Sequence, residues 1–299
     1  MKQCLSLKKH PKFSGRKGPL LLIIMDGIGI GKEYEGNAVY LAKTQTLDKL
    51  FKSELFTTLQ AHGTAVGLPT DEDMGNSEVG HNALGAGRVF AQGAKRVNLA
   101  IEDGSLFEGE VWKKLTQNCL KNNSKLHFIG LLSDGNVHSH IDHLFALIKK
   151  AAEIGIKKVR VHPLLDGRDV PEKSALIYID KLENFLEEFR KKGLDYRIAS
   201  GGGRMVTTMD RYFADWNIVK RGYDAHVHGI GRQFRSAREA IETFYNEDAK
   251  ITDQYLPSFV IVEDGKPVGK IEDGDSVIFF NFRGDRAIEI SMAFEYDDF

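Results

Sequence analysis

The stretch Leu126-His-Phe-Ile-Gly-Leu-Leu132, followed at once by Ser133-Asp-Gly-Asn-Val-His-Ser-His140, sets the pattern for most of this chain. Its first part is almost continuously apolar, which is typical of a strand buried on both faces of a sheet. Its second part is rich in polar side chains. In parallel α/β sheets, ligands bind at the carboxyl ends of the strands, so this polar loop stands where a ligand is expected.

The same alternation continues towards the C-terminus. Further strands are expected over residues 159–165, 196–200, 258–262 and 276–282. Helices are expected over residues 142–154, 172–192, 205–220, 235–246 and 285–294, with turns over 263–275. This rhythm predicts a mostly parallel, doubly wound α/β sheet. The segment Gln92-Gly-Ala-Lys-Arg-Val-Asn98 holds a glycine and a basic pair, and we expect a hinge between domains there.

The part of the chain before this pattern is different. Residues 1–18 are polar and basic, which predicts a mobile arm. Leu20–Met25 is a short apolar run that ends in Asp26-Gly27, which favours a buried strand over a signal peptide because no small-residue cleavage site follows. A helix over 37–52 and a short strand over 56–60 follow. No apolar run approaches the length that a bilayer requires.

The bulk composition excludes several classes of partner. The chain has 299 residues, which suggests one large or two medium domains, and a formal net charge of −1. A charge so close to zero gives no general attraction to nucleic acid or to a membrane surface, so an anionic ligand must be held by a local cluster. The two cysteines, Cys4 and Cys119, suggest neither a disulfide nor a metal site, which fits a reducing compartment.

Polar residues collect after four of the predicted strands. These loops are Ser133–His140, Asp166-Gly-Arg-Asp169, Gly201-Gly-Gly-Arg204 with Asp210-Arg211, and Arg283-Gly-Asp-Arg286. Because parallel strands end at the same edge of a sheet, we expect the loops to converge on one pocket that holds arginines, a histidine and carboxylates. The planar guanidinium suits bidentate contacts with phosphate and carboxylate. The pocket therefore indicates a small substrate with more than one negative charge.

The spacing of the arginines adds detail to this prediction. Arg204 and Arg211 are two helical turns apart in the expected helix, so they would share a face. Arg283 and Arg286 are one turn apart and would do the same. One such arginine alone would be read as a surface ion pair, whereas four strand ends together favour a site. The glycines 201–203 form either a turn or backbone that lets a ligand approach a helix N-terminus.

Ser77 is the candidate nucleophile, within Asp71-Glu-Asp-Met-Gly-Asn-Ser77-Glu-Val-Gly-His81-Asn-Ala-Leu-Gly-Ala-Gly-Arg88. A helix is expected from Glu78, so Ser77 would lie where free backbone N–H groups and the positive helix dipole favour phosphate. The alternative is an N-cap serine without chemistry. Asp26, at the end of the first expected strand, is either a metal or phosphate-site acid or a turn aspartate.

His138 and His140 are the best acid/base candidates, because histidine titrates in the physiological range. Their spacing, with Asp142-His143 nearby, could also suggest a metal, but the surrounding arginines would oppose a divalent ion. The remaining histidines considered are taken as structural, with His81 the closest case: His62, His81, His127, His162, His226 and His228.

Taken together, these motifs resemble cofactor-independent phosphoglycerate mutase, in particular the form found in plants and trypanosomatids. The matching stretches run in family order: Met25-Asp-Gly27, Asp73–His81 with Gly85-Ala-Gly-Arg88, Leu132–His140, Leu165–Asp169, Ser200–Arg204 with Met209-Asp-Arg-Tyr212, and Asn281–Arg286. Departures such as Asn136 and Gly284 fall at positions without an assigned role.

The resemblance implies a metal-dependent, alkaline-phosphatase-like domain with an inserted α/β phosphotransferase domain. On this basis residues 19–95 would be the first segment of the phosphatase-like domain and 96–299 the inserted, substrate-binding domain. The family is roughly twice as long, and its other metal ligands lie in C-terminal Asp and His motifs that are absent here. We therefore expect an N-terminal fragment, ending between elements, that is inactive alone and monomeric in its full-length form.

The resemblance also implies roles for individual residues. Ser77 would carry the phosphoryl group between the 3- and 2-positions of glycerate, and Asp26 and Ser77 would touch two manganese or magnesium ions, with no bisphosphoglycerate needed. Asp169 would accept a proton from the glycerate hydroxyl. The residues expected to hold the substrate are His138, Arg168, Asp169, Arg204, Arg211, Arg283 and Arg286. The enzyme would be cytoplasmic, with phosphoglycerate as its partner and neither nucleic acid nor membrane.

Two other functions remain open from the residues alone. The first is a phosphoglycerate-binding module that keeps the arginine pocket but performs no catalysis. The second is another enzyme of the alkaline phosphatase superfamily, such as a phosphopentomutase or a phosphohydrolase. The loop around Ser77 does not exclude this second alternative, whereas the five arginines and the order of the motifs argue against it.

Overall fold

The computed structural model describes residues 9–298 and divides the chain into two compact units, Met1–Leu59 and Gln60–Phe299. The first residues of the arm expected over 1–18, and Cys4 with them, lie outside the described residues. Within residues 9–298, no helix is both long enough and apolar enough to cross a bilayer.

The first unit contains two short helices where one was expected. α1 (Ala38–Leu41) is capped by Asn37, whose side-chain oxygen accepts hydrogen bonds from backbone N–H groups of the first turn. The backbone becomes extended at Ala42, and α2 (Gln45–Phe51) begins after it. The continuous helix predicted over 37–52 is therefore wrong, because the chain leaves the helical conformation between the two segments.

The strands expected at Leu20–Met25 and at 56–60 are also wrong. Both segments are irregular, and the side chain of Leu20 is 87% exposed. A strand is defined by hydrogen bonds to a neighbour, and no described residue pairs with either segment. Apolar composition alone therefore does not make these residues a strand.

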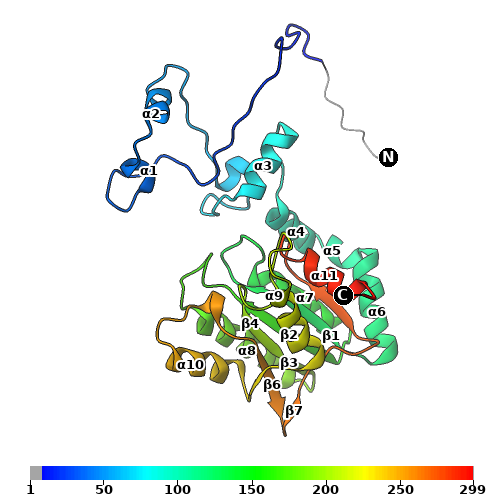
Figure 1. Cartoon of the computed structure of the whole chain (residues 1–299). Helices are drawn as coiled ribbons and strands as arrows, with labels where there is room; N and C mark the ends of the chain where they lie inside the picture. Colours follow the sequence, from blue (N-terminus) through cyan, green and yellow to red (C-terminus); the bar gives the residue numbers. More distant parts are fainter. Residues whose placement is uncertain (1–8, 299) are drawn as a thin grey trace. The chain divides into compact units, whose positions relative to one another are not determined.

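The second unit contains the sheet (Figure 1). Its helices are η1 (Gly63–Val66), α3 (Ser77–Ala86), α4 (Gly93–Glu102), α5 (Ser105–Glu108), α6 (Glu110–Asn122), α7 (Ile141–Glu153), α8 (Ala175–Arg190), α9 (Trp216–Tyr223), η2 (Asp224–His228), α10 (Ala237–Glu247), η3 (Asp253–Tyr255) and α11 (Ile288–Glu295). Its strands are β1 (Leu126–Leu132), β2 (Lys158–Leu165), β3 (Asp195–Ile198), β4 (Ser200–Gly203), β5 (Arg232–Phe234), β6 (Phe259–Glu263), β7 (Lys266–Pro267) and β8 (Ser276–Phe279).

The sheet has the order β5-β6-β4-β2-β1-β8, with β3 paired to the first half of β2 and β7 to β6. The pairs β1–β2, β1–β8, β2–β3, β2–β4 and β5–β6 are parallel, whereas β4–β6 and β6–β7 are antiparallel. The mostly parallel α/β sheet predicted from the sequence is thus confirmed, with an antiparallel connection at β6.

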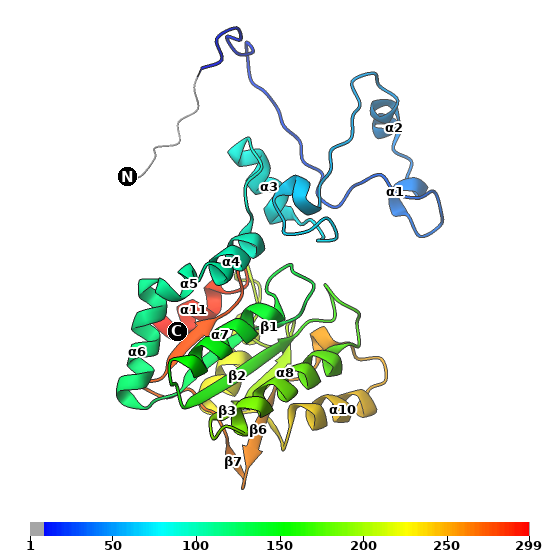
Figure 2. The same cartoon turned by 180° about the vertical axis from the view of Figure 1, so that it is seen from behind.

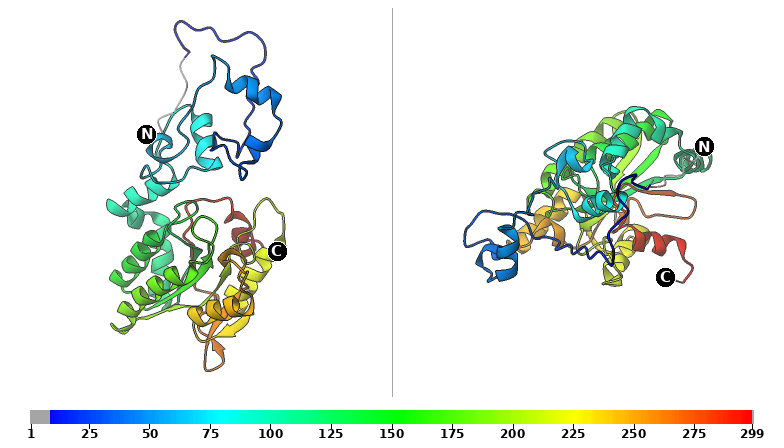
Figure 3. Two further views of the ribbon diagram at one scale, coloured as in Figure 1. Left: turned by 90° about the vertical axis from the view of Figure 1, so that its left-hand side faces the viewer. Right: turned by 90° about the horizontal axis from the view of Figure 1, so that it is seen from above.

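Helices cover both faces of this sheet. Phe128 and Val161 point into the main core, which also contains side chains of α6, α7, α8 and α10. Ile129 and Leu164, which alternate with them, point to the other face, where Val219 of α9 and Ile290 of α11 form a further apolar cluster. Figures 1 and 2 show these two faces from opposite sides, and the left view of Figure 3 shows α7 and α8 across the sheet from α11.

The glycines 201–203 lie in strand β4 rather than in a turn or ligand loop. A Cβ at Gly203 would stand 2.5 Å from backbone atoms of Asp253 and Gln254, and one at Gly201 would stand 2.6 Å from the Pro163 carbonyl. Glycine is required here because other backbone passes within contact distance of the strand.

One further expectation differs from the structure. The helix expected over 205–220 begins only at Trp216, because Thr208, Tyr212 and Phe213 have φ values of 73°, 63° and 59°, outside the helical region. The segment near Gln92, where a hinge is expected, forms the start of helix α4, and the hinge itself stays a prediction.

Candidate active site

Asp166 organises the loops that follow β1 and β2. Its Oδ1 accepts hydrogen bonds from the backbone N–H groups of Arg168 and Asp169, at 3.2 and 3.1 Å. The same oxygen accepts a hydrogen bond from Arg204 Nη1 at 2.7 Å, and Oδ2 accepts one from the Ser133 hydroxyl at 2.6 Å. Asp169 Oδ2 also binds Arg204 Nη1. The buried guanidinium of Arg204 is therefore held between two carboxylates.

Asp285 organises the loop that follows β8. Its Oδ2 lies 3.0 Å from Arg211 Nη1 and 3.1 Å from Arg283 Nη2. Its Oδ1 lies 3.6 Å from His138 Nδ1. The backbone N–H of Phe282 donates to the His138 carbonyl at 2.9 Å, which ties this loop to the one after β1. The structure thus brings the strand-end loops together at one edge of the sheet.

Arg286 is the buried cation of the strand-end loops with the fewest hydrogen bonds among residues 9–298. Its Nη1 donates to the Met209 carbonyl at 2.5 Å, while its Nε is buried without a hydrogen-bond partner among residues 9–298. Burial, followed by the nearby charges of Arg211 and Arg204, lowers the pKa of Arg286 to about 10. An anion bound beside this guanidinium would offset the repulsion from the neighbouring arginines and raise the pKa of Arg286 again.

His138 lies close to the same arginines. Burial, and then the charges of Arg204, Arg283, Arg286 and Arg211, lower the pKa of His138 to about 2. The imidazole is therefore neutral, and its Nδ1 is buried without a hydrogen bond within the described chain. A neutral imidazole here suits hydrogen bonding to a ligand.

His140 has a different role from the one expected. Its Nδ1 accepts a hydrogen bond from the Asp142 backbone N–H at 3.2 Å, so it caps helix α7. His143 Nε2 contacts Asn98 Oδ1 at 2.5 Å, and its ring packs against Phe282, which precedes Arg283. The prediction that His140 serves as an acid or base is not supported by this position, because its accepting nitrogen is occupied by the helix cap.

The shared helical faces expected for the arginine pairs are wrong. Residues 205–215 are not helical, and α11 begins at Ile288, after Arg286. Arg211 and Arg283 nevertheless meet, because both bind Asp285. Arg168 is exposed, yet its charge is close enough to contribute to the lowered pKa of Arg286.

Ser77 is the first residue of helix α3, and Asn76 rather than Ser77 is its N-cap, accepting from the Val79 N–H. The exposed Ser77 hydroxyl lies 3.4 Å from His81 Nδ1. The same Nδ1 lies 2.7 Å from the Ser77 carbonyl oxygen, which can only accept a hydrogen bond. His81 Nδ1 therefore carries a proton in this arrangement and is not placed to deprotonate the serine.

Two contacts join the Ser77 segment to the arginine loops. Glu78 Oε2 lies 3.0 Å from Arg283 Nε. Asn136 Nδ2 donates to Asp73 Oδ1 at 2.6 Å. The helix that begins at Ser77 is thereby attached to the loops after β1 and β8.

The residues present do not by themselves form a metal site. Asp26 lies in a turn of the first unit, and Ser77 belongs to the second. Among residues 9–298 there is no group of three or more His, Cys, Asp or Glu side chains that could hold a metal ion. A metal site usually needs several such ligands, so these two residues do not provide a complete set.

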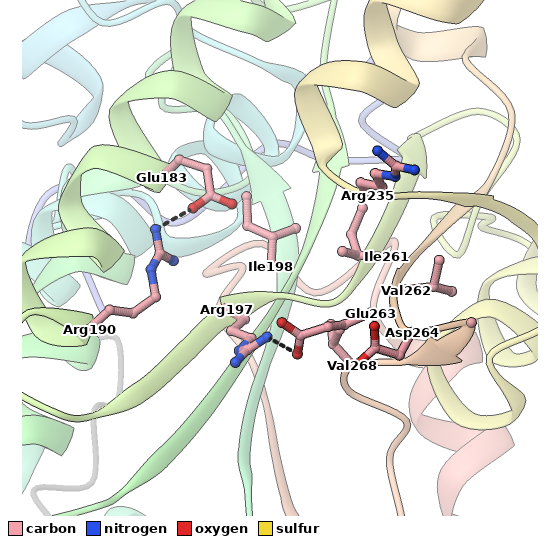
Figure 4. Close-up of a pocket in the computed structure, with 11 residues that line it drawn as sticks. Glu183, Arg190, Arg197, Ile198, Arg235, Ile261, Val262, Glu263, Asp264 and Val268 are labelled. Carbon is pink, nitrogen blue, oxygen red and sulfur yellow. Dashed lines mark hydrogen bonds and ion pairs between the residues drawn. The ribbon is translucent and has the colours of Figure 1, made fainter.

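A second hollow, of about 600 Å³, lies beside β3 and β6 and also holds arginines (Figure 4). Here Arg190 binds Glu183 and Arg197 binds Glu263. Two of its cations are thus paired with carboxylates, of which Glu183 is half-buried and Glu263 exposed, whereas Arg286 has no carboxylate within ion-pair distance in the described chain. The cluster of arginines at the strand ends is the stronger candidate for binding an anion.

Three residues are central in the geometry although their sequence pattern indicates no role for them. Asp166 and Asp285 hold the arginines, and Asn136 connects two distant loops. The first two could have been found, because they lie within the same strand-end loops as the chosen arginines. The contact between Asn136 and Asp73 could not, because it joins segments that are far apart in the sequence.

Comparison with known proteins gives a consistent result. The family model for the N-terminus of BPG-independent phosphoglycerate mutase matches residues 97–299. A relative from Leptospira interrogans is 58% identical over 295 residues, which is 98% of this chain and 54% of the relative. The 2,3-bisphosphoglycerate-independent phosphoglycerate mutase of Trypanosoma brucei brucei is 54% identical over 297 residues, 99% of this chain and 54% of that protein.

A solved structure agrees. The Leishmania mexicana phosphoglycerate mutase at low cobalt concentration is similar with a TM-score of 0.89 and 54% identity, over 92% of this chain and 51% of that one. The chain thus spans about half the length of the relatives it matches. The family match over residues 97–299, together with the order of the motifs, shows that the chain belongs to the BPG-independent phosphoglycerate mutase family, as its N-terminal part.

Proposed function

We propose that this chain supplies the phosphoryl-carrying serine and the substrate pocket of a 2,3-bisphosphoglycerate-independent phosphoglycerate mutase, which interconverts 3-phosphoglycerate and 2-phosphoglycerate. The observation that carries the proposal is the group of arginines around His138 and Asp285, joined to the Ser77 helix by the contact between Arg283 and Glu78.

The charges of the pocket fit a phosphoglycerate. A phosphate monoester carries about −1.5 to −2 charges at pH 7, and the carboxylate of glycerate adds one more. Arg204 is already neutralised by Asp166 and Asp169, whereas within residues 9–298 Arg286 forms a hydrogen bond only to the Met209 carbonyl. We assign Arg286, with Arg168, Arg211 and Arg283 around it, to the anionic groups of the substrate, and His138 to a hydrogen bond with it.

The chemistry assigned to the chain's own residues is a double transfer. In the first transfer the Ser77 hydroxyl loses its proton as a bond forms between Ser77 Oγ and phosphorus, and the bond from phosphorus to the glycerate oxygen breaks, so that this oxygen takes up a proton. In the second transfer the neighbouring glycerate hydroxyl loses its proton and binds phosphorus, while the bond from Ser77 Oγ to phosphorus breaks and Ser77 regains a proton. Asp169 is proposed as the group that exchanges the glycerate proton. The arginines would hold glycerate while it reorients between the two transfers.

We also propose the finer features that the family resemblance implies. Two manganese or magnesium ions would lower the pKa of the serine hydroxyl, with Asp26 and Ser77 as this chain's contacts to them. Residues 19–95 would belong to an alkaline-phosphatase-like domain and 96–299 to the inserted phosphotransferase domain. The complete enzyme would be a cytoplasmic monomer.

The proposal is tested with a chimera in which residues 1–299 are followed by the remaining half of the Leptospira interrogans relative. We expect mutase turnover and a phosphoserine at position 77, both abolished by Ser77→Ala. The matched control is Ser105→Ala, which removes an exposed helix serine and should leave turnover unchanged. Full turnover in the Ser77→Ala chimera would contradict the assignment of Ser77.

A second candidate is a phosphoglycerate-binding module without catalysis. It is favoured by one observation, that the arginine pocket is built from residues of the second unit alone. The two candidates agree on the ligand and differ on turnover. A chimera that binds 3-phosphoglycerate but neither turns it over nor becomes phosphorylated would favour the binding module.

A further inference from the structure

A continuous row of buried polar side chains crosses the sheet face that packs against α9 and α11. In order, its members are Asp275, His127, His162, Ser200, His226 and Thr208, which we call the histidine chain. From Asp275 Oδ2 onwards, the successive contacts measure 3.1, 2.9, 2.6, 2.8 and 2.9 Å. The family roles discussed above involve none of these residues.

The sheet register creates the first half of this row. His127 of β1 and His162 of β2 point to the same face, and their positions are diagonal neighbours because His162 pairs with Ile129. Ser200 begins β4, on the other side of β2. His226 lies in the π-helical turn η2, a type of turn that often occurs at functional sites. The row therefore joins three strands to η2.

The histidines of the row are neutral. Burial is the main reason that the pKa values of His127, His162 and His226 all fall below the usual range, to about 3 for His226. Asp275 is ionised. Burial raises its pKa, but hydrogen bonds from His127 and from the backbone N–H groups of Lys125 and Glu272 have the larger effect and bring the pKa below its usual value.

The carboxylate at one end fixes the direction of every hydrogen bond. Because Asp275 only accepts, His127 donates from Nε2 and must accept at Nδ1. His162 then donates from Nε2 and accepts at Nδ1 from the Ser200 hydroxyl. Ser200 Oγ in turn accepts from His226 Nδ1–H, which leaves His226 Nε2 to accept from Thr208. All five protons point towards Asp275, as the order of the contacts requires.

The other end of the row lies next to the candidate active site. Thr208 has a φ of 73°, which is unusual for a β-branched residue. Its side chain is confined between His226 and the backbone of Gly222, where an added Cβ would stand 2.0 Å from Thr208 Oγ1. The next residue, Met209, offers its carbonyl to Arg286, and Arg211 follows two residues later.

We propose that the histidine chain is a positioning device, in which Asp275 sets the direction of the hydrogen bonds that hold Thr208 in its left-handed conformation. Held in this way, Thr208 places the Met209 carbonyl against Arg286 and Arg211 against Asp285. The members of the row are positioning residues, since none of them contacts the pocket. The identity of the ligand, phosphoglycerate, rests on the proposed function. The hydrogen-bond directions in the histidine chain do not depend on it.

The hydrogen-bond directions follow from the histidine tautomers, which are measured by ¹⁵N NMR of the rings in the full chain without ligand. We expect N–H at Nε2 of His127 and His162 and at Nδ1 of His226. Asp275→Leu removes the acceptor that fixes these directions, so the three rings should together lose the single tautomer pattern of the unaltered chain, with Asp273→Asn as an exposed control that changes none. A different pattern in the unaltered chain, or the same pattern in Asp275→Leu, would overturn the proposal.

The claim that Thr208 positions Arg286 and Arg211 is tested by substitutions at Thr208. Thr208→Val, which keeps the shape but removes the hydroxyl, should shift the Nε–H signals of Arg286 and Arg211 and weaken 3-phosphoglycerate binding about five-fold, the usual effect of one hydrogen bond. Thr208→Ser should restore both. Unchanged arginine signals in Thr208→Val would overturn the proposal. If the unaltered chain does not bind 3-phosphoglycerate, the proposed function fails, while the NMR signals still decide this inference.

Discussion

Two apolar runs of this chain, Leu20–Met25 and Leu126–Leu132, have similar composition and opposite outcomes. The first is irregular, with Leu21 80% exposed, whereas the second is strand β1, with Leu131 1% exposed. β1 has β2 and β8 as hydrogen-bonded neighbours and helices on both faces. An apolar run therefore becomes a strand only where neighbouring strands pair with it, and within residues 9–298 the packed core lies in the second unit.

The largest expected contrast between the two regions concerns arginine. Arg204→Met should lower the free energy of unfolding by about 3–5 kcal/mol, because it leaves Asp166 buried without its partner. The matched change Arg16→Met, at an exposed position of the first unit, should stay within about 0.5 kcal/mol. Urea denaturation followed by circular dichroism measures both. Equal stability of the two variants would show that Arg204 is not held as described.

The two apolar runs can be compared directly. Leu131→Ala should cost about 2–5 kcal/mol of unfolding free energy, since it opens a cavity in a packed core. Leu21→Ala removes the same atoms from an exposed side chain and should change stability by less than about 0.5 kcal/mol. The same denaturation experiment applies. A large loss in Leu21→Ala would mean that this run is buried in solution.

Glycine gives a smaller contrast of the same kind. Gly203→Ala should cost about 1–3 kcal/mol, because the new methyl group would press on the backbone of Asp253 and Gln254. Gly29→Ala has open space around it, so its stability should stay unchanged or rise slightly. Thermal unfolding of the two variants side by side measures the difference. A neutral Gly203→Ala would argue against the close approach of η3 to β4.

The smallest contrast concerns pH. The pKa of His226 is lowered to about 3, so between pH 6.5 and 3 the unfolded chain binds a proton that the folded chain does not. Stability therefore falls as the pH drops below 6.5, and at pH 5.5 this one group should account for a loss of about 1.4 kcal/mol. His226→Asn should flatten the pH dependence of the denaturation midpoint between pH 6.5 and 5, whereas His10→Asn, at an exposed site, should not. An unchanged slope in His226→Asn would contradict burial of a neutral imidazole.

Much of the second unit could be predicted because its strands are marked by local patterns. β1 and β2 are apolar runs with polar loops at their ends, and the parallel sheet brings those loops together. The left-handed conformation of Thr208 could not be predicted, because it arises from contacts with His226 and Gly222 that are distant in the sequence. The loop that holds Arg211 was therefore mistaken for a helix.

The histidines show the same limit. His127 and His162 look like isolated core residues in the sequence, and only the register of β1 and β2 places them side by side. The prediction of a strand at Leu20–Met25 fails for the opposite reason. The local apolar pattern is that of a strand, but no strand among the described residues pairs with this segment.

The central claim, that the second unit holds an anion pocket for phosphoglycerate, is tested most directly by calorimetric titration of 3-phosphoglycerate into the 299-residue chain. We expect saturable heat with one site per chain, and binding weakened about 10- to 100-fold by Arg286→Met, since hydrogen bonds to charged groups have about that effect. Arg235→Met, in the second hollow of Figure 4, should bind normally. No heat from a chain with a native circular dichroism spectrum, or equal weakening in both variants, would contradict the account.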